Sequence, residues 1–143
     1  MRKVFLFHSH NKMFTTTIKF NIPKILEDIL INLQELGATP TLVGGCVRDY
    51  FLNIPVKDYD VEIFGIDCFE IIEKSLKKYG SVKLVGKSFG VLTLRVDEYD
   101  FDFALPRIEK KTGNTHQDFE VITNANLSFK EAAIRRDFTI NAI

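Results

Sequence analysis

The chain has 143 residues, 45% of them hydrophobic and 27% charged, and its nineteen basic residues balance nineteen acidic ones. This length suits one domain, and this composition excludes a disordered tail and a fibrous repeat. A formal net charge of zero excludes an arm that binds nucleic acid by bulk positive charge, although a nucleic-acid enzyme that uses a few local cations remains compatible with it. We expect no membrane partner, because no apolar run approaches the roughly 18 residues of a membrane span.

Two cysteines, Cys46 and Cys68, give neither a disulfide framework nor a zinc-binding pattern. We therefore expect a reduced, cytoplasmic protein. The first twelve residues, MRKVFLFHSHNK, lack the apolar stretch and the cleavage site of a signal peptide. We treat residues 1–20 as an N-terminal extension and residues 21–143 as the domain.

The hydrophobic pattern predicts a mixture of helices and short strands. In chain order we expect a helix at 22–36, a strand at 41–43, a helix at 46–53, a strand at 58–64, a helix at 67–79, strands at 82–85, 91–96 and 99–105, a polar mobile loop at 106–126, and a last helix from 128. Asn21 is the expected cap of the first helix and Gly37 its stop.

Two further helix starts resemble capping boxes, in which a side chain at each end of the first turn bonds the backbone of the other. Asp67 and Glu70 have this spacing before the third helix, and Ser128 and Glu131 have it before the last one. We expect each pair to cap the start of its helix.

Asp58 and Asp60 lie two residues apart on a predicted strand, so both carboxylates face the same way, as does Glu62. Like charges held so close are costly unless a cation lies between them, and Mg²⁺ prefers such oxygen ligands. Alone, the pair is more often a solvated face of an edge strand. Asp102, on a later strand whose apolar neighbours face away, joins them as a third carboxylate if the two strands are adjacent.

Gly44-Gly45 ends a strand and opens a helix, where backbone N–H groups approach an anion closely. Arg48 lies on the first turn of that helix and reaches the same anion. The segment is neither a dinucleotide fingerprint nor a P-loop. Alone it is equally a tight turn, but with Arg48 and the nearby carboxylates it predicts a phosphate site beside a metal site.

Arg135, Arg136 and Asp137 stand between apolar residues near the end of the sequence, so part of this stretch packs. A packed arginine needs an anionic partner, which is either an internal acid or a triphosphate. These residues alone leave both readings open.

Three motifs, LVGGCVRD at 42–49, KDYDVE at 57–62 and RRDFTINA at 135–142, occur in this order, with supporting segments at 86–90 and 101–107. In them the chain resembles the class II tRNA nucleotidyltransferases (CCA-adding enzymes) and the bacterial poly(A) polymerases. The resemblance covers roughly residues 41–143.

This resemblance implies an α+β fold, the catalytic head of the DNA-polymerase-beta-like nucleotidyltransferase superfamily. Such a head is a small mixed β-sheet backed by helices, with its carboxylates on the open face. The implied activity is template-independent transfer of a nucleotide from CTP or ATP to a tRNA or other RNA 3′ end, with release of pyrophosphate, by a two-metal mechanism with Mg²⁺.

The resemblance also implies roles for individual residues. The implied roles are metal binding for Asp58 and Asp60, a third catalytic carboxylate for Asp102, nucleotide contacts for Gly44, Gly45, Arg48 and Arg136, and positioning of the ribose for Asp137 and Asn141.

Enzymes of this family continue into neck, body and tail regions, which carry the E-D-x-x-R element that selects C or A and much of the tRNA surface. We therefore expect an excised head or one part of a split enzyme, completed by a C-terminal region or a partner chain. The alternatives are the head of a poly(A) polymerase or of a CC-adding or A-adding enzyme, a non-catalytic nucleotide-binding module, and a stand-alone enzyme that modifies a protein or an antibiotic. The presence of both Asp58 and Asp60 disfavours the non-catalytic module. The stand-alone enzyme is disfavoured because such enzymes usually carry Gly-Ser where this chain carries Gly-Gly.

Overall fold

The computed structural model describes residues 2–7, 13–18, 20–85, 90–111 and 119–134. The helices of this part are α1 (Lys24–Glu35), α2 (Gly45–Phe51), α3 (Phe69–Leu76) and α4 (Phe129–Ile134). The strands are β1 (Arg2–Phe7), β2 (Met13–Ile18), β3 (Thr39–Val43), β4 (Asp58–Phe64), β5 (Val82–Val85), β6 (Val91–Val96), β7 (Tyr99–Ala104), β8 (Arg107–Lys111) and β9 (Phe119–Thr123).

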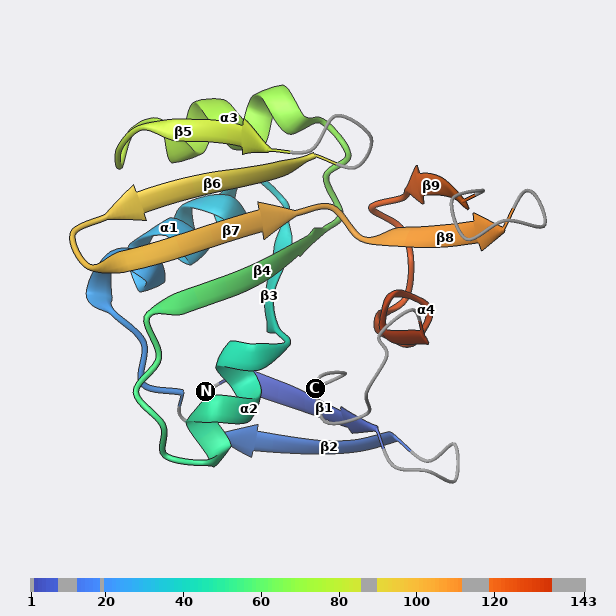
Figure 1. Ribbon diagram of the computed structural model, residues 1–143, viewed down its shortest axis with the longest axis horizontal. Coiled ribbons are helices and arrows are strands. Elements are labelled where there is room, and N and C mark those ends of the chain that lie inside the picture. The colour runs from blue at the N-terminus through green and yellow to red at the C-terminus, as the bar shows by residue number, and fades with distance from the viewer. Residues whose placement is uncertain (1, 8–12, 19, 86–89, 112–118, 135–143) are drawn as a thin grey trace.

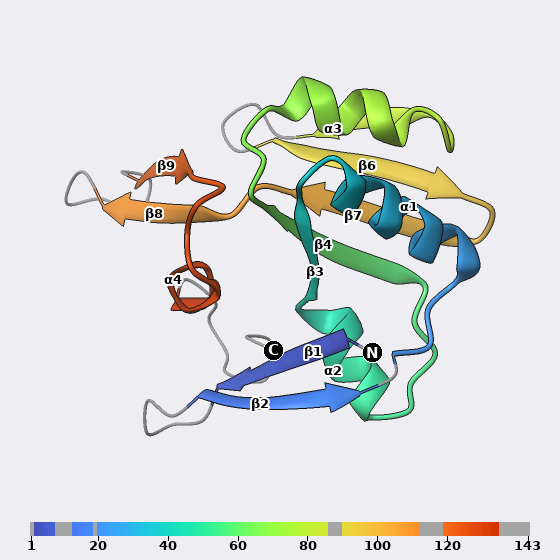
Figure 2. The same cartoon turned by 180° about the vertical axis from the view of Figure 1, so that it is seen from behind.

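The centre of the molecule is a five-stranded sheet with the order β3-β4-β7-β6-β5. The β4–β7 pair is parallel and the other three pairs are antiparallel, so the sheet is mixed. Helices α1 and α3 lie on one side of this sheet, behind it in Figure 1 and in front of it in Figure 2. The expected α+β class, a small mixed sheet backed by helices, is confirmed.

The core lies between the sheet and these helices. Tyr59 and Val61 of β4 and Phe101 and Phe103 of β7 are buried there. Helix α1 contributes an apolar face whose residues recur at helical spacing, namely Leu26, Ile29, Leu30 and Leu33. Because side chains alternate along a strand, burying these residues turns the acidic positions of β4 and β7 to the opposite face of the sheet.

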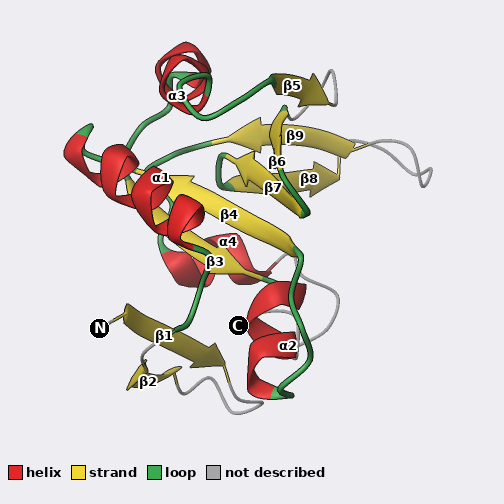
Figure 3. Cartoon of the chain, turned by 90° about the vertical axis from the view of Figure 1, so that its left-hand side faces the viewer, coloured by secondary structure: helices red, strands yellow, loops and turns green. Residues whose placement is uncertain are grey.

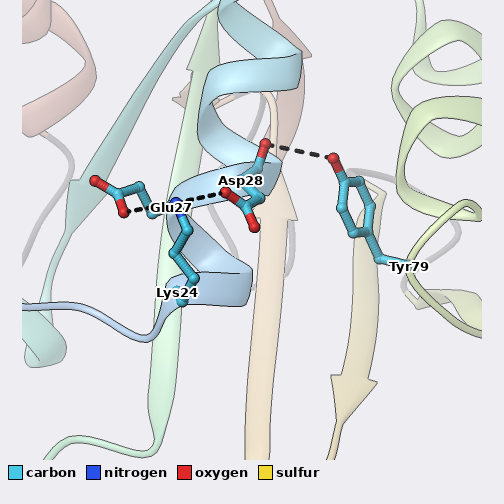
Figure 4. A network of polar contacts seen from close by, with 4 residues as sticks. All are labelled: Lys24, Glu27, Asp28 and Tyr79. Carbon is cyan, nitrogen blue, oxygen red and sulfur yellow. Dashed lines mark hydrogen bonds and ion pairs between the residues drawn. The ribbon is translucent and has the colours of Figure 1, made fainter.

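A small polar network fixes α1 beside the segment that follows α3 (Figure 4). The hydroxyl of Tyr79 donates to the backbone oxygen of Asp28 at 3.3 Å, and the Lys24 ammonium lies 2.9 Å from the Asp28 carboxylate and 3.3 Å from that of Glu27. The exposed ion pairs contribute little stability, because solvent screens them. The Tyr79 contact joins α1 to the segment that follows α3. Figure 3 shows these helices from the side.

The start of α1 differs from the expectation, whereas its end agrees with it. The helix begins directly after Pro23 without any side-chain cap, so the prediction that Asn21 caps it is wrong. Asn21 lies too far ahead, because the entry is set by the fixed φ of Pro23. Gly37 has φ +91° directly after the helix, and its N–H donates to the backbone oxygen of Gln34, which confirms the stop.

Of the two capping boxes, one forms and one does not. Ser128 N–H donates to Glu131 Oε2 at 2.8 Å and Glu131 N–H donates to Ser128 Oγ at 3.3 Å, as expected. Helix α3 instead begins after Cys68, whose thiol donates to Glu70 Oε2, so the Asp67 box is wrong. Cys68 takes the cap position, one residue later than the spacing required.

Two hairpins lie outside the central sheet. β1 pairs with β2 within the N-terminal extension, and β8 pairs with β9 where we expected a mobile loop over 106–126. That expectation is wrong for Arg107–Lys111 and Phe119–Thr123, which pair with each other as antiparallel strands. β8 is mostly charged (RIEKK), whereas β9 (FEVIT) carries apolar residues. In the described segments no helix combines the length and hydrophobicity needed to cross a membrane, and both cysteines are free thiols.

Candidate active site

The acidic residues of β4 and β7 meet across the one parallel pair of the central sheet. Asp58 lies opposite Asp100 and Asp60 lies opposite Asp102 in the strand register. β4 and β7 are therefore adjacent, which is the condition under which Asp102 joins Asp58 and Asp60 as a third carboxylate. Asp58 and Asp60 are exposed, whereas Asp102 is half-buried.

Asp60 and Asp102 share a cavity of about 190 Å³ on this face of the sheet. Its lining residues are Val43, Asp60, Val61, Glu62, Val91, Asp102, Ala104 and Arg107. Asp58 stays outside this cavity, at the exposed start of β4. The structure thus brings two of the three expected carboxylates into one cavity and places the third on the same strand beside it.

The turn into α2 lies next to these carboxylates, because Val43, which precedes it, is opposite Asp60 in the β3–β4 register. Gly44 has φ 72° and ψ −139°, a conformation that essentially only glycine adopts without strain. Gly45 begins the helix, and a Cβ placed on it would lie 3.6 Å from Arg48 Nη2. Gly44, Gly45 and Arg48 are therefore close together at the edge of the site.

Arg48 is half-buried and is held by its neighbour in sequence. Its Nε donates to Asp49 Oδ1 at 2.7 Å, and its Nη2 lies 2.7 Å from the same oxygen. Fixing a guanidinium in this way reduces the entropy lost when it binds an anion.

Cys46 lies beneath the turn and connects three elements. Its thiol donates to the backbone oxygen of Val43 at 3.2 Å and lies 4.0 Å from that of Asp60. Burial raises the pKa of this thiol to about 11. Cys46 is therefore a packed, protonated thiol that joins α2 to β3 and β4, and not a nucleophile.

Strand β6 supplies a partner for each of the two acids on β7. Thr93 is opposite Asp102 in the register, and its hydroxyl donates to Asp102 Oδ1 at 2.6 Å. Arg95 is opposite Asp100, with Nε 3.5 Å from Asp100 Oδ1. Asp100 is thereby engaged in an ion pair at the exposed end of the sheet.

Sequence reasoning missed three residues of this site. It placed Glu62 on the acidic face without a role, yet Glu62 is only 3% exposed and lines the cavity. Arg107, which brings a positive charge to the cavity, lies within a family-like segment that signalled it. Thr93 had no sequence signal, because its contact depends on the β6–β7 register.

Three expected residues, Arg136, Asp137 and Asn141, lie outside the described residues. Their contacts with a nucleotide stay a prediction.

The donor set fits Mg²⁺ as a cation shared with a substrate. Among the described residues, no group of three or more His, Cys, Asp or Glu side chains could hold a metal ion by itself. Mg²⁺ is usually bound by one or two carboxylates together with substrate phosphates, and not by a complete protein cage. Asp58 and Asp60, exposed on one strand beside Asp102, match that pattern.

Comparison with known proteins agrees with this architecture. The family model described as the poly A polymerase head domain matches residues 41–143. A CCA-adding enzyme of Buchnera aphidicola subsp. Acyrthosiphon pisum (strain Tuc7) is 39% identical over 102 residues, and a multifunctional CCA protein of Shewanella denitrificans is 37% identical over 102 residues. Each match covers 71% of this chain and 23% of the relative, so the chain spans about a quarter of the length of these enzymes.

Solved structures give the same result. A CCA-adding enzyme in its apo form II superimposes with a TM-score of 0.63 and 28% identity, over 85% of this chain and 28% of that one. A tRNA nucleotidyltransferase complexed with a primer tRNA and an incoming ATP analog gives a TM-score of 0.58 and 30% identity, over 80% of this chain and 29% of that one. With a family match over residues 41–143 and this shared fold, the chain belongs to the poly(A) polymerase head-domain family.

Proposed function

We propose that this chain is the catalytic head of an RNA nucleotidyltransferase of the CCA-adding type. It transfers a nucleotide from CTP or ATP to the 3′ end of a tRNA and releases pyrophosphate. The observation that carries this proposal is the pairing of Asp60 with Asp102 across β4 and β7, in one cavity beside the Gly44 turn. The named relatives, which are CCA-adding enzymes, support it.

In this proposal Asp58, Asp60 and Asp102 hold Mg²⁺, two ions being used in the reaction. When bound, Mg²⁺ neutralises charge on the triphosphate and activates the attacking 3′-hydroxyl. The contribution of the protein is to fix the carboxylates in advance: the sheet sets the spacing of Asp60 and Asp102, and the exposed start of β4 leaves Asp58 open to substrate.

The triphosphate lies at the turn between β3 and α2. Gly44 has no side chain to block the approach of phosphate to the backbone, and the Arg48 guanidinium, held near Gly45 by Asp49, pairs with phosphate oxygens. By the family resemblance, Arg136 contributes a further nucleotide contact, and Asp137 with Asn141 positions the ribose.

Other activities of the same family, and a module without catalysis, are the alternatives. A poly(A) polymerase head is favoured by the description of the matching family, and a CC-adding or A-adding head would use the same carboxylates. A non-catalytic module is disfavoured by the intact acidic pair. We place base selection and most tRNA contacts in the remaining parts of such enzymes, and the activity in the cytoplasm, where free thiols stay reduced.

A head exchange tests this function. Residues 21–143, which include α1, replace the matching head of a CCA-adding enzyme. Labelled CTP and ATP are supplied with a tRNA that lacks its 3′ CCA. We expect the chimera to add nucleotides to the 3′ end. A correctly folded chimera that binds tRNA but adds no nucleotide would contradict the proposal, and the parental enzyme is the matched control.

A further inference from the structure

Strand β6 contacts the two acids of β7 in different ways. Arg95 and Asp100 form a loose ion pair at 3.5 Å between an exposed arginine and a half-buried aspartate. Thr93 and Asp102 form a short hydrogen bond of 2.6 Å between half-buried side chains. This length is typical of a hydroxyl that donates to a charged carboxylate, which is one of the stronger hydrogen bonds in proteins.

The Thr93 contact fixes the orientation of a soft group. The last torsion of an aspartate side chain is broad and roughly two-fold, so a carboxylate without a hydrogen bond turns easily. Threonine is branched at Cβ and stiff at χ1, so its hydroxyl is held in one direction. Because the hydroxyl engages Oδ1 of Asp102, it selects one setting of the carboxylate and leaves Oδ2 to a ligand.

The neighbour of Asp102 on the side away from Thr93 is Asp60, and this neighbour indicates the purpose of the orientation. Asp102 lies between Thr93 on one side and Asp60 on the other, so the three residues form a row across β6, β7 and β4. The cavity that Asp102 and Asp60 share lies on this row.

We propose that Thr93 is a positioning residue that presents the Asp102 carboxylate to a divalent cation shared with Asp60. This inference rests on the proposed function, because it assumes that a cation is bound there. Outer groups that orient metal-binding carboxylates typically change metal affinity by about 10-fold or more when they are removed. Thr93 thus tunes the site without touching the substrate.

Mn²⁺ alone serves as the probe, and its binding to the 143-residue chain is measured by electron paramagnetic resonance. Thr93→Val removes the donor and keeps the branched shape, whereas Thr93→Ser keeps the hydroxyl. We expect Thr93→Val to weaken Mn²⁺ binding about 10-fold and Thr93→Ser to restore most of the affinity. The matched control is Thr41→Val, because the Thr41 hydroxyl contacts only a backbone oxygen, that of Thr39, at 3.4 Å.

Folding is followed separately by thermal melting, and Thr93→Ala replaces Thr93→Val if the latter does not fold. If Thr93→Val or Thr93→Ala binds Mn²⁺ as tightly as the unmodified chain, whatever its Tm, the role of Thr93 is overturned. The role is also overturned if Thr93→Ser weakens Mn²⁺ binding as much as Thr93→Val does. Asp60→Asn separates the two proposals. If it abolishes binding while Thr93→Val does not weaken it, only the role of Thr93 fails, whereas binding that survives Asp60→Asn overturns both.

Discussion

Asp60 and Asp102 lie directly opposite each other on β4 and β7, the only parallel neighbours among the described strands of the central sheet. Each strand has its acids on one face because its aromatic and aliphatic residues are buried on the other. The same alternation therefore produces both the core and the acidic face of the sheet. The two carboxylates share their cavity with Arg107, so the site combines acidic oxygens with a positive charge.

The Gly44 turn supplies the first prediction. Gly44→Ala forces a side chain into a glycine-only conformation, and we expect a loss of roughly 1–3 kcal/mol of unfolding free energy, measured by urea denaturation. Gly45→Ala is the matched control. Its Cβ would meet Arg48 Nη2 at an ordinary 3.6 Å, so we expect a change within about 0.5 kcal/mol. Equal stability of the two variants would contradict the assigned turn geometry.

Nucleotide binding supplies the second prediction. We assign the site residues in the described part of the chain, which are carboxylates, a glycine turn and guanidinium groups, to the phosphates and the cation. By the family resemblance, base selection belongs to the E-D-x-x-R element of the remaining parts of such enzymes. We expect ATP and CTP to bind the 143-residue chain with Mg²⁺ at dissociation constants that differ by less than about 10-fold, and Arg136→Ala to weaken both alike. Isothermal titration of both nucleotides checks this. A strong preference for CTP, or the loss of one nucleotide only in Arg136→Ala, would show that these residues read the base.

Cys46 supplies a prediction on pH. Its pKa is raised to about 11 in the folded protein, above the ordinary value of 9.0, so folding favours the protonated thiol. This contribution to stability is fully present below pH 9 and is lost as the pH rises from about 9 to 11. We expect Cys46→Ala to flatten the fall of Tm over this range.

Thiol reactivity provides a second readout of the same burial. At pH 8 we expect an aromatic disulfide reagent to modify the half-buried Cys68 quickly and Cys46 only at the rate of global or local opening. Cys68→Ser isolates the slow thiol as a control. Two equally fast thiols in the native protein would mean that Cys46 is accessible.

The sequence predicts the parts of the fold that have an apolar face. β4, β6 and β7 are located well because their alternation is strong. β8 and β9 are missed because Pro106, Gly113 and the polar residues of 106–126 favour a loop. The sequence predicts that Asp60 and Asp102 lie close together only if their two strands are adjacent, because strand order depends on contacts between distant parts of the chain. The Thr93 contact was unpredictable for the same reason, and the cap at Asn21 failed because Pro23 sets the helix entry.

The central claim is that Asp58, Asp60 and Asp102 support nucleotide transfer, and one rate tests this claim most directly. In the chimera that carries residues 21–143, the rate of single-nucleotide addition to tRNA is compared between the unmodified head and Asp60→Asn, a change that removes the charge and keeps the shape. Asp100→Asn is the matched control, because it removes a carboxylate of the neighbouring strand β7 that lies outside the cavity and is paired with Arg95. We expect Asp60→Asn to lower the rate by orders of magnitude at an unchanged or higher Tm, and Asp100→Asn to have a small effect. A rate for Asp60→Asn close to that of the unmodified head would contradict the account.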